Sequence, residues 1–123
     1  LIDYKTGTPP TPAQQKHFDK QLFLTAAMAE GGGFPGLGPQ EVARLSYVGL
    51  KAVLDIQSTE LDPGDVTEVW SEFGRLMASY SRPGQGYTAR RALESVRDVS
   101  DYDHLSRFGE WDMTEDPSPE DLA

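Results

Sequence analysis

Residues 39–57 read PQEVARLSYVGLKAVLDIQ, and the fold expected for the chain depends on how this stretch is interpreted. Apolar residues recur in it at the 3.6-residue period of an α-helix, which predicts a helix that begins near Pro39. A first apolar stripe comprises Val42, Leu45, Gly49, Ala52, Val53 and Ile56, and a second comprises Tyr47, Leu50 and Leu54. A helix that is apolar on two sides is typically central, so we expect neighbouring helices on both sides of it.

Three further segments predict helices around this one. The segment 12–30 is preceded by Thr11, which is a typical N-cap. Proline follows at the first helical position, and Gln14 completes a capping box. Residues 63–81 repeat apolar side chains at the i, i+3, i+4, i+7 spacing of an amphipathic helix. Residues 88–99 carry a shorter stripe of the same kind. We find no alternating segment of a length that would predict a strand.

The sequence therefore predicts an all-α fold, a small four-helix bundle-like domain. We expect an extended arm over residues 1–10, a helical domain over residues 11–109 and an acidic tail over residues 110–123. The expected core comprises Phe18, Leu22, Leu45, Val53, Ile56, Val69, Trp70, Phe73, Leu76, Leu93 and Val96.

Length and composition restrict the class of protein. A chain of 123 residues with 37 % hydrophobic and 25 % charged residues is the size of one domain and can bury one modest core. The absence of cysteine excludes disulfides, thiolate metal sites and cysteine nucleophiles. There is no 18-residue apolar run that would predict a membrane span, and no leader pattern is visible. We expect a cytoplasmic or virion-associated protein.

The net charge of −9 is unevenly distributed along the chain. Six acids and no base fall between Glu110 and Ala123, whereas the preceding 109 residues carry 14 acids and 11 bases. An acidic body argues against a phosphate-binding surface, so nucleic acid is not an expected partner. The segment from Arg82 to Arg107 holds five of the seven arginines, and DNA binding through that segment is our third functional hypothesis.

The glycine-rich stretch GGGFPGLG at residues 31–38 fits the letters of the dinucleotide-binding fingerprint. That fingerprint requires a strand before the glycines and a helix start after them, whereas a helical pattern precedes this stretch. Pro35 and Pro39 also remove amide donors that a phosphate would need. We expect a loop between two helices, with no nucleotide, cofactor or small-molecule substrate bound there.

The two histidines do not predict a catalytic or metal site. His17 has no histidine or glutamate three or four residues away that could complete a metal pair on one helix face. His104 lies among Asp98, Asp101 and Asp103, but the spacing lacks the glycine and the distal glutamate of a calcium loop. Helix capping and solvation account for these acids, and we expect a protein that is not an enzyme.

The remaining features indicate contacts with other proteins. Proline-rich and acidic ends cannot bury enough apolar surface to order alone, so we expect neighbouring subunits to hold them. The expected function is a non-catalytic structural or adaptor subunit of a larger assembly, for example a phage-type virion connector or neck component. The alternative is a small helical regulator of one soluble partner, such as an immunity or antitoxin-like protein. The expected partner-binding residues are Leu1, Ile2, Tyr4, Phe34, Leu37, Trp111 and Met113.

Overall fold

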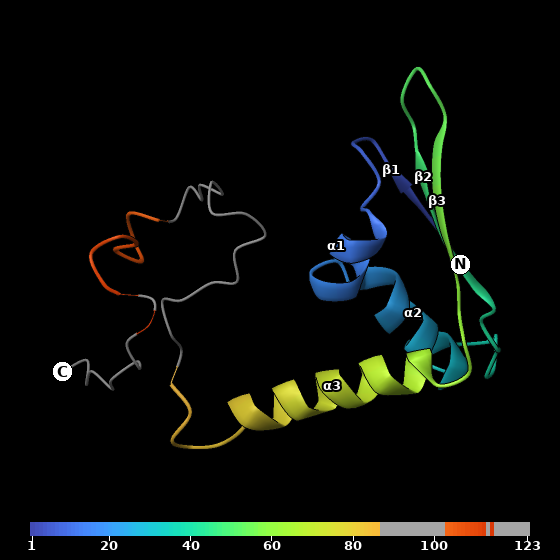
Figure 1. The fold of residues 1–123 in the computed structure, drawn as a ribbon. Coiled ribbons are helices and arrows are strands. Elements are labelled where there is room, and N and C mark those ends of the chain that lie inside the picture. The colour runs from blue at the N-terminus through green and yellow to red at the C-terminus, as the bar shows by residue number, and fades with distance from the viewer. Residues whose placement is uncertain (87–102, 113, 115–123) are drawn as a thin grey trace. The chain divides into compact units, whose positions relative to one another are not determined.

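The computed structural model describes residues 1–86, 103–112 and 114, and within them it has an α/β fold. The prediction of an all-α four-helix bundle is wrong, because the first compact unit, Leu1–Met77, contains a three-stranded mixed sheet with the helices on one side of it (Figure 1). The elements in chain order are β1 (Ile2–Lys5), α1 (Pro12–His17), α2 (Gln21–Glu30), β2 (Arg44–Gly49), β3 (Asp55–Glu60) and α3 (Asp65–Tyr80).

The sheet has the strand order β1-β2-β3. Strand β1 runs parallel to β2, with Asp3 opposite Tyr47, and the crossover between them carries α1 and α2. Strand β3 returns antiparallel to β2, with Tyr47 opposite Gln57. Directly opposite residues point to the same face of a sheet, so this register decides which side chains meet the helices.

The hydrophobic core lies between one face of the sheet and the helices. Strand β2 alternates buried and half-buried residues, and its Leu45 and Tyr47 are nearly inaccessible to solvent. Helix α2 contributes Leu22 and Ala26 to the same cluster, and Val66 joins it from the start of α3. In the described part of the chain, helices cover only this face of the sheet (Figure 1).

The helix expected over residues 39–57 is replaced by a loop and two strands. Its 3.6-residue stripe coexists with a 2-residue alternation in RLSYVG, where Leu45, Tyr47 and Gly49 are buried. The hairpin loop between the strands is LKAVL, which contains good helix formers and no turn-forming residue. Pairing with β1, more than 40 residues earlier in the chain, selects the strand over the helix.

The other helix predictions have mixed outcomes. The capping box of Thr11 and Gln14 is confirmed, but the helix expected over residues 12–30 is divided into α1 and α2. The helix is interrupted at Phe18, where the amides of Phe18 and Asp19 both donate to the carbonyl oxygen of Gln14, each at 2.8 Å. Helix α3 confirms the helix expected over residues 63–81 within the uncertainty of its ends. The helix expected over residues 88–99 lies outside the described residues.

The predicted core is only partly correct. Leu22, Leu45 and Val69 are buried as expected, and Phe73 is half-buried. Leu93 and Val96 lie outside the described residues. The expected core residues that are instead exposed are Phe18, Val53, Ile56, Trp70 and Leu76. Two of them, Val53 and Ile56, belong to the helix expected over residues 39–57; the strand register turns Ile56 away from the core, and Val53 lies in the hairpin loop.

Much of the expected arm belongs to the sheet. Residues 2–5 form β1, and Pro9 is buried against Gly49, where an added Cβ atom would come within 3.0 Å of the proline ring. In the second unit, the Trp111 indole donates to the Ser106 carbonyl oxygen at 2.9 Å. None of the helices in the described part of the chain combines the length and apolar character that a membrane span requires.

Candidate functional site

Strand β1 has the reverse of the usual amphipathic pattern. Its apolar residues, Ile2 and Tyr4, are exposed, whereas Asp3 and Lys5 lie opposite Tyr47 and Gly49 on the face that the helices cover. The Asp3 and Lys5 side chains are only 20 % and 28 % exposed. Charged residues are seldom placed in such positions, so this strand departs from the pattern that the fold alone would require.

These two side chains belong to a compact polar group, which we name the Asp3–Lys5 cluster and which comprises Asp3, Lys5, Asp19, Gln21 and Tyr47. The Lys5 ammonium lies 2.9 Å from Asp3 Oδ2 and donates to Gln21 Oε1 at 3.1 Å. It also lies 5.4 Å from the centre of the Tyr47 ring. Strand β1, the α1–α2 junction and strand β2 thus each contribute to one site.

Tyr47 links the sheet to the start of α2. Its hydroxyl donates to Asp19 Oδ1 at 3.0 Å and accepts a hydrogen bond from the Leu22 amide. Burial raises the pKa of Tyr47 well above its ordinary value, and the hydrogen bond to Asp19 raises it further. Tyr47 therefore stays protonated at neutral pH and holds the Asp19 carboxylate in place.

Lys5 stays protonated for a similar reason. Its hydrogen bond to Asp3 raises its pKa above the ordinary lysine value; burial acts in the opposite direction, and the charges of Asp3 and Asp19 add to the increase. An ammonium with a raised pKa is a poor general base. It is well suited to contact an anionic oxygen, because it remains a positive charge throughout the physiological pH range.

The Lys5 ammonium is the one partner that the described residues give to Asp3 Oδ2. This oxygen is shielded from solvent and, apart from the ion pair with Lys5, receives no hydrogen bond. A shielded carboxylate oxygen ordinarily accepts bonds from donors or coordinates a cation. The two carboxylates of the cluster exceed its one ammonium, so a further positive charge would be compatible with the site.

The start of α2 adds partial positive charge to the cluster. The N-cap residue is Lys20, its side chain makes no capping bond, and the first turn contains no acid. The unsatisfied amides at the start of a helix attract negative charge. Gln21, the first residue of α2, already contacts Lys5, so the amide side chain and the ammonium adjoin the positive end of the helix.

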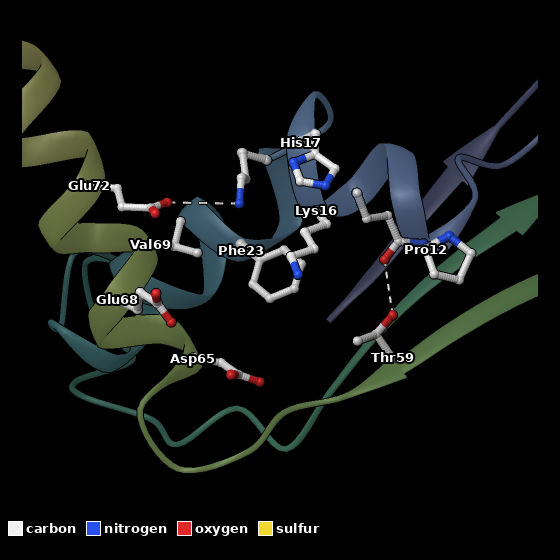
Figure 2. A pocket seen from close by; sticks show the side chains of 11 residues that line it. Pro12, Lys16, His17, Phe23, Thr59, Asp65, Glu68, Val69 and Glu72 are labelled. Carbon is white, nitrogen blue, oxygen red and sulfur yellow. Dashed lines mark hydrogen bonds and ion pairs between the residues drawn. The ribbon is translucent and has the colours of Figure 1, made fainter. Parts of the chain in front are cut away.

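A second feature is a cleft of about 540 Å³ between α1, α2 and α3. Figure 2 shows Asp65, Glu68 and Glu72 on the α3 side, with Phe23 between them and the basic residues of α1. The basic side carries Lys16, His17 and Lys20, and Lys20 lies 4.0 Å from Glu72. Because the two walls carry opposite charges, the cleft has no net preference for an anion, and we do not take it as the functional site.

The structure separates the residues expected to bind partners. Leu1, Ile2 and Tyr4 lie at β1, and the Leu1 amino group donates to the Arg44 carbonyl oxygen at 2.8 Å. Phe34 is half-buried and Leu37 is exposed, both in the loop after α2. Trp111 belongs to the second unit and contacts Phe108 edge-on, and Met113 lies outside the described residues. Partner binding by these residues remains a prediction.

The other motifs occupy ordinary positions. The glycine-rich stretch connects helix α2 to strand β2, so it joins a helix to a strand and not the two helices expected, and it opens no helix. His17 ends α1 and is exposed, and His104 is exposed in the second unit. Among the described residues, no group of three or more histidine or acidic side chains is placed to hold a metal ion. Asp98, Asp101 and most of the Arg82–Arg107 segment lie outside the described residues.

No protein-family model, curated protein or solved structure matches this chain. The geometry of the Asp3–Lys5 cluster is therefore what points to a function. Sequence reasoning missed this cluster because IDYK is too short for its alternation to predict a strand. The signal available in the sequence was the alternation itself, in which the apolar residues Ile2 and Tyr4 alternate with the charged residues Asp3 and Lys5.

The buried tyrosine predicts a loss of stability at alkaline pH. The pKa of Tyr47 is raised in the folded state, so its contribution to stability is complete below pH 10 and is lost as the pH rises further. Between the unfolded and folded pKa values, one such group lowers the free energy of unfolding by about 1.4 kcal/mol per pH unit. Urea titrations from pH 8 to pH 11 should show a steeper decline in wild type than in Tyr47→Phe. An equal decline of the free energy of unfolding with pH in the two proteins would contradict the claim that the Tyr47 hydroxyl is buried and protonated.

Proposed function

We propose that the Asp3–Lys5 cluster is the centre of a magnesium-dependent site that hydrolyses a phosphate ester. The observation that supports this proposal is the pairing of the Asp3 carboxylate with the Lys5 ammonium, whose atoms lie 2.9 Å apart beside the first residue of α2. A carboxylate that can take a cation and an ammonium that can take an anion are thus placed side by side.

The cation side of the site suits magnesium. Mg²⁺ takes oxygen ligands, keeps several water molecules and is usually held by one or two carboxylates together with substrate phosphate oxygens. Asp3 supplies one carboxylate, and Asp19 is close enough to influence the pKa of Lys5. A site with few protein ligands therefore fits an ion whose remaining positions are filled by water and substrate.

The anion side of the site suits a phosphoryl group. Lys5 is a permanent positive charge, and it is hydrogen-bonded to Gln21, the first residue of α2. A phosphoryl group that bridges the cation and Lys5 would have its developing negative charge stabilised from two directions. A water molecule would then form the new oxygen–phosphorus bond and lose a proton to solvent, while the ester oxygen leaves as an anion with the electron pair of the broken bond.

The proposal is tested by release of 4-nitrophenolate from bis(4-nitrophenyl) phosphate, measured by absorbance with Mg²⁺ or Mn²⁺ present. We expect slow release that EDTA abolishes and that falls at least tenfold in Asp3→Asn, because the neutral amide is a weaker cation ligand. Glu41→Gln removes one negative charge from an exposed residue outside the cluster and is the matched control. Release that is absent from wild type, or equal in Asp3→Asn and wild type, would refute the proposal.

The non-catalytic subunit expected from the sequence is a second candidate function. The observation that favours it is the number of large apolar side chains exposed on the sheet and hairpin, since contiguous exposed apolar surface commonly marks an interaction site. This role and the hydrolytic role use opposite faces of the sheet, so one protein could have both.

A further inference from the structure

The second face of the sheet is not covered by any helix in the described part of the chain. We name it the open face, and it comprises Ile2, Tyr4, Arg44, Ser46, Val48, Ile56, Ser58 and Glu60. Tyr4, Val48 and Ile56 lie opposite one another in a continuous apolar row that crosses all three strands. Tyr4 is 63 % exposed and Ile56 is 52 % exposed.

The polar side chains of the open face are already paired with one another. The hydroxyls of Ser46 and Ser58 are hydrogen-bonded at 2.9 Å, and Arg44 forms an ion pair with Glu60. Burying a polar group is costly when it loses its partners. Here the serine pair could be buried with its hydrogen bond intact, while the Arg44–Glu60 pair lies at one end of the strands.

The charge of the face decides which partner it suits. The chain carries a net charge of −9, so two copies repel one another as whole molecules. The open face carries only Arg44 and Glu60, and these neutralise each other. Two copies can therefore approach one another through this face without bringing like charges together.

The open face also offers large apolar side chains to an interface between two copies. Ile2, Tyr4 and Ile56 are each more than half exposed, and so are the adjoining hairpin residues Leu50 and Leu54. Large apolar side chains are thus available to an interface of the standard size, ~800 Å² per partner. Interfaces between identical subunits are also more apolar than others.

We propose that a second copy of this chain covers the open face, so that two sheets pack face to face about a two-fold axis. Such a contact is isologous, because the same apolar row meets itself across the axis. The Asp3–Lys5 cluster lies on the opposite face and stays accessible in this dimer. The inference therefore does not depend on the hydrolytic function.

Sedimentation equilibrium of the full chain tests the proposal. We expect wild type to be a dimer at micromolar concentration and Ile56→Lys to dissociate with at least a tenfold higher dissociation constant. Leu37→Lys places the same charge on an exposed apolar residue in the loop after α2 and should remain a dimer. Far-UV circular dichroism verifies that each variant is folded.

Two results would overturn the proposal. The first is a wild-type chain that stays monomeric across the micromolar range. The second is a dimer that Ile56→Lys leaves unchanged, which would indicate pairing at a strand edge or through another surface. Asp3→Asn should leave the dissociation constant unchanged, which separates this result from that of the hydrolysis assay.

Discussion

Replacing Leu45 with alanine is expected to lower the free energy of unfolding by roughly 2–5 kcal/mol, the usual cost of truncating a fully buried leucine. Leu45 is completely buried in the centre of β2 and contacts α2 residues in the core cluster. The helices on one side and the paired strands on both sides leave little freedom for the site to relax into the vacated volume. Urea unfolding followed by circular dichroism measures the change.

Val53→Ala is the matched control, because the alternative helix over residues 39–57 would place Val53 in the same core. In the hairpin, Val53 is 79 % exposed at the tip. Its truncation should therefore change stability by no more than about 0.5 kcal/mol, as for most surface substitutions. Comparable losses for the two variants would favour the helix and contradict the sheet.

The elements that the sequence predicted correctly are those whose signals are local. The capping box of Thr11 and Gln14 is formed by residues three positions apart, and α3 has an apolar period sustained over four turns. Such signals need no knowledge of the rest of the chain. Their agreement with the structure follows from helix hydrogen bonds being made between near neighbours.

The sheet could not be predicted because its decisive contacts are distant in sequence. Strand β1 is four residues long, and its hydrogen bonds are to a strand that starts at Arg44. Strand β3 alternates half-buried and exposed residues without a strongly apolar face. The hairpin loop lacks glycine, asparagine and proline, so nothing local marked the end of one strand and the start of the next.

The candidate site was missed for the same reason. Asp3 and Lys5 are ordinary charged residues in an extended segment until the parallel register with β2 turns them toward the helices. Asp19 joins them only because the chain breaks between α1 and α2, which the continuous helix expected over residues 12–30 did not allow. The net negative charge of the whole chain also gave no indication of a local group with the Lys5 ammonium at its centre.

The central claim is that the Asp3 carboxylate binds a metal ion beside the Lys5 ammonium, and it predicts opposite effects for two substitutions on the same strand. Asp3→Asn removes the cation ligand and should weaken Mn²⁺ binding at least tenfold. Lys5→Met removes the ammonium 2.9 Å away, which repels a cation, and should leave the affinity equal or higher. Mn²⁺ is a suitable probe because it prefers the same oxygen ligands as Mg²⁺.

Titration of the full chain with Mn²⁺, followed by electron paramagnetic resonance of the free ion, tests this claim most directly. Glu41→Gln controls for the loss of one negative charge, and circular dichroism verifies the fold of each variant. The account predicts one site in wild type, lost in Asp3→Asn and retained in Lys5→Met and Glu41→Gln. If Asp3→Asn binds Mn²⁺ as tightly as wild type does, or if wild type has no specific site, then Asp3 and Lys5 form a structural ion pair and nothing more.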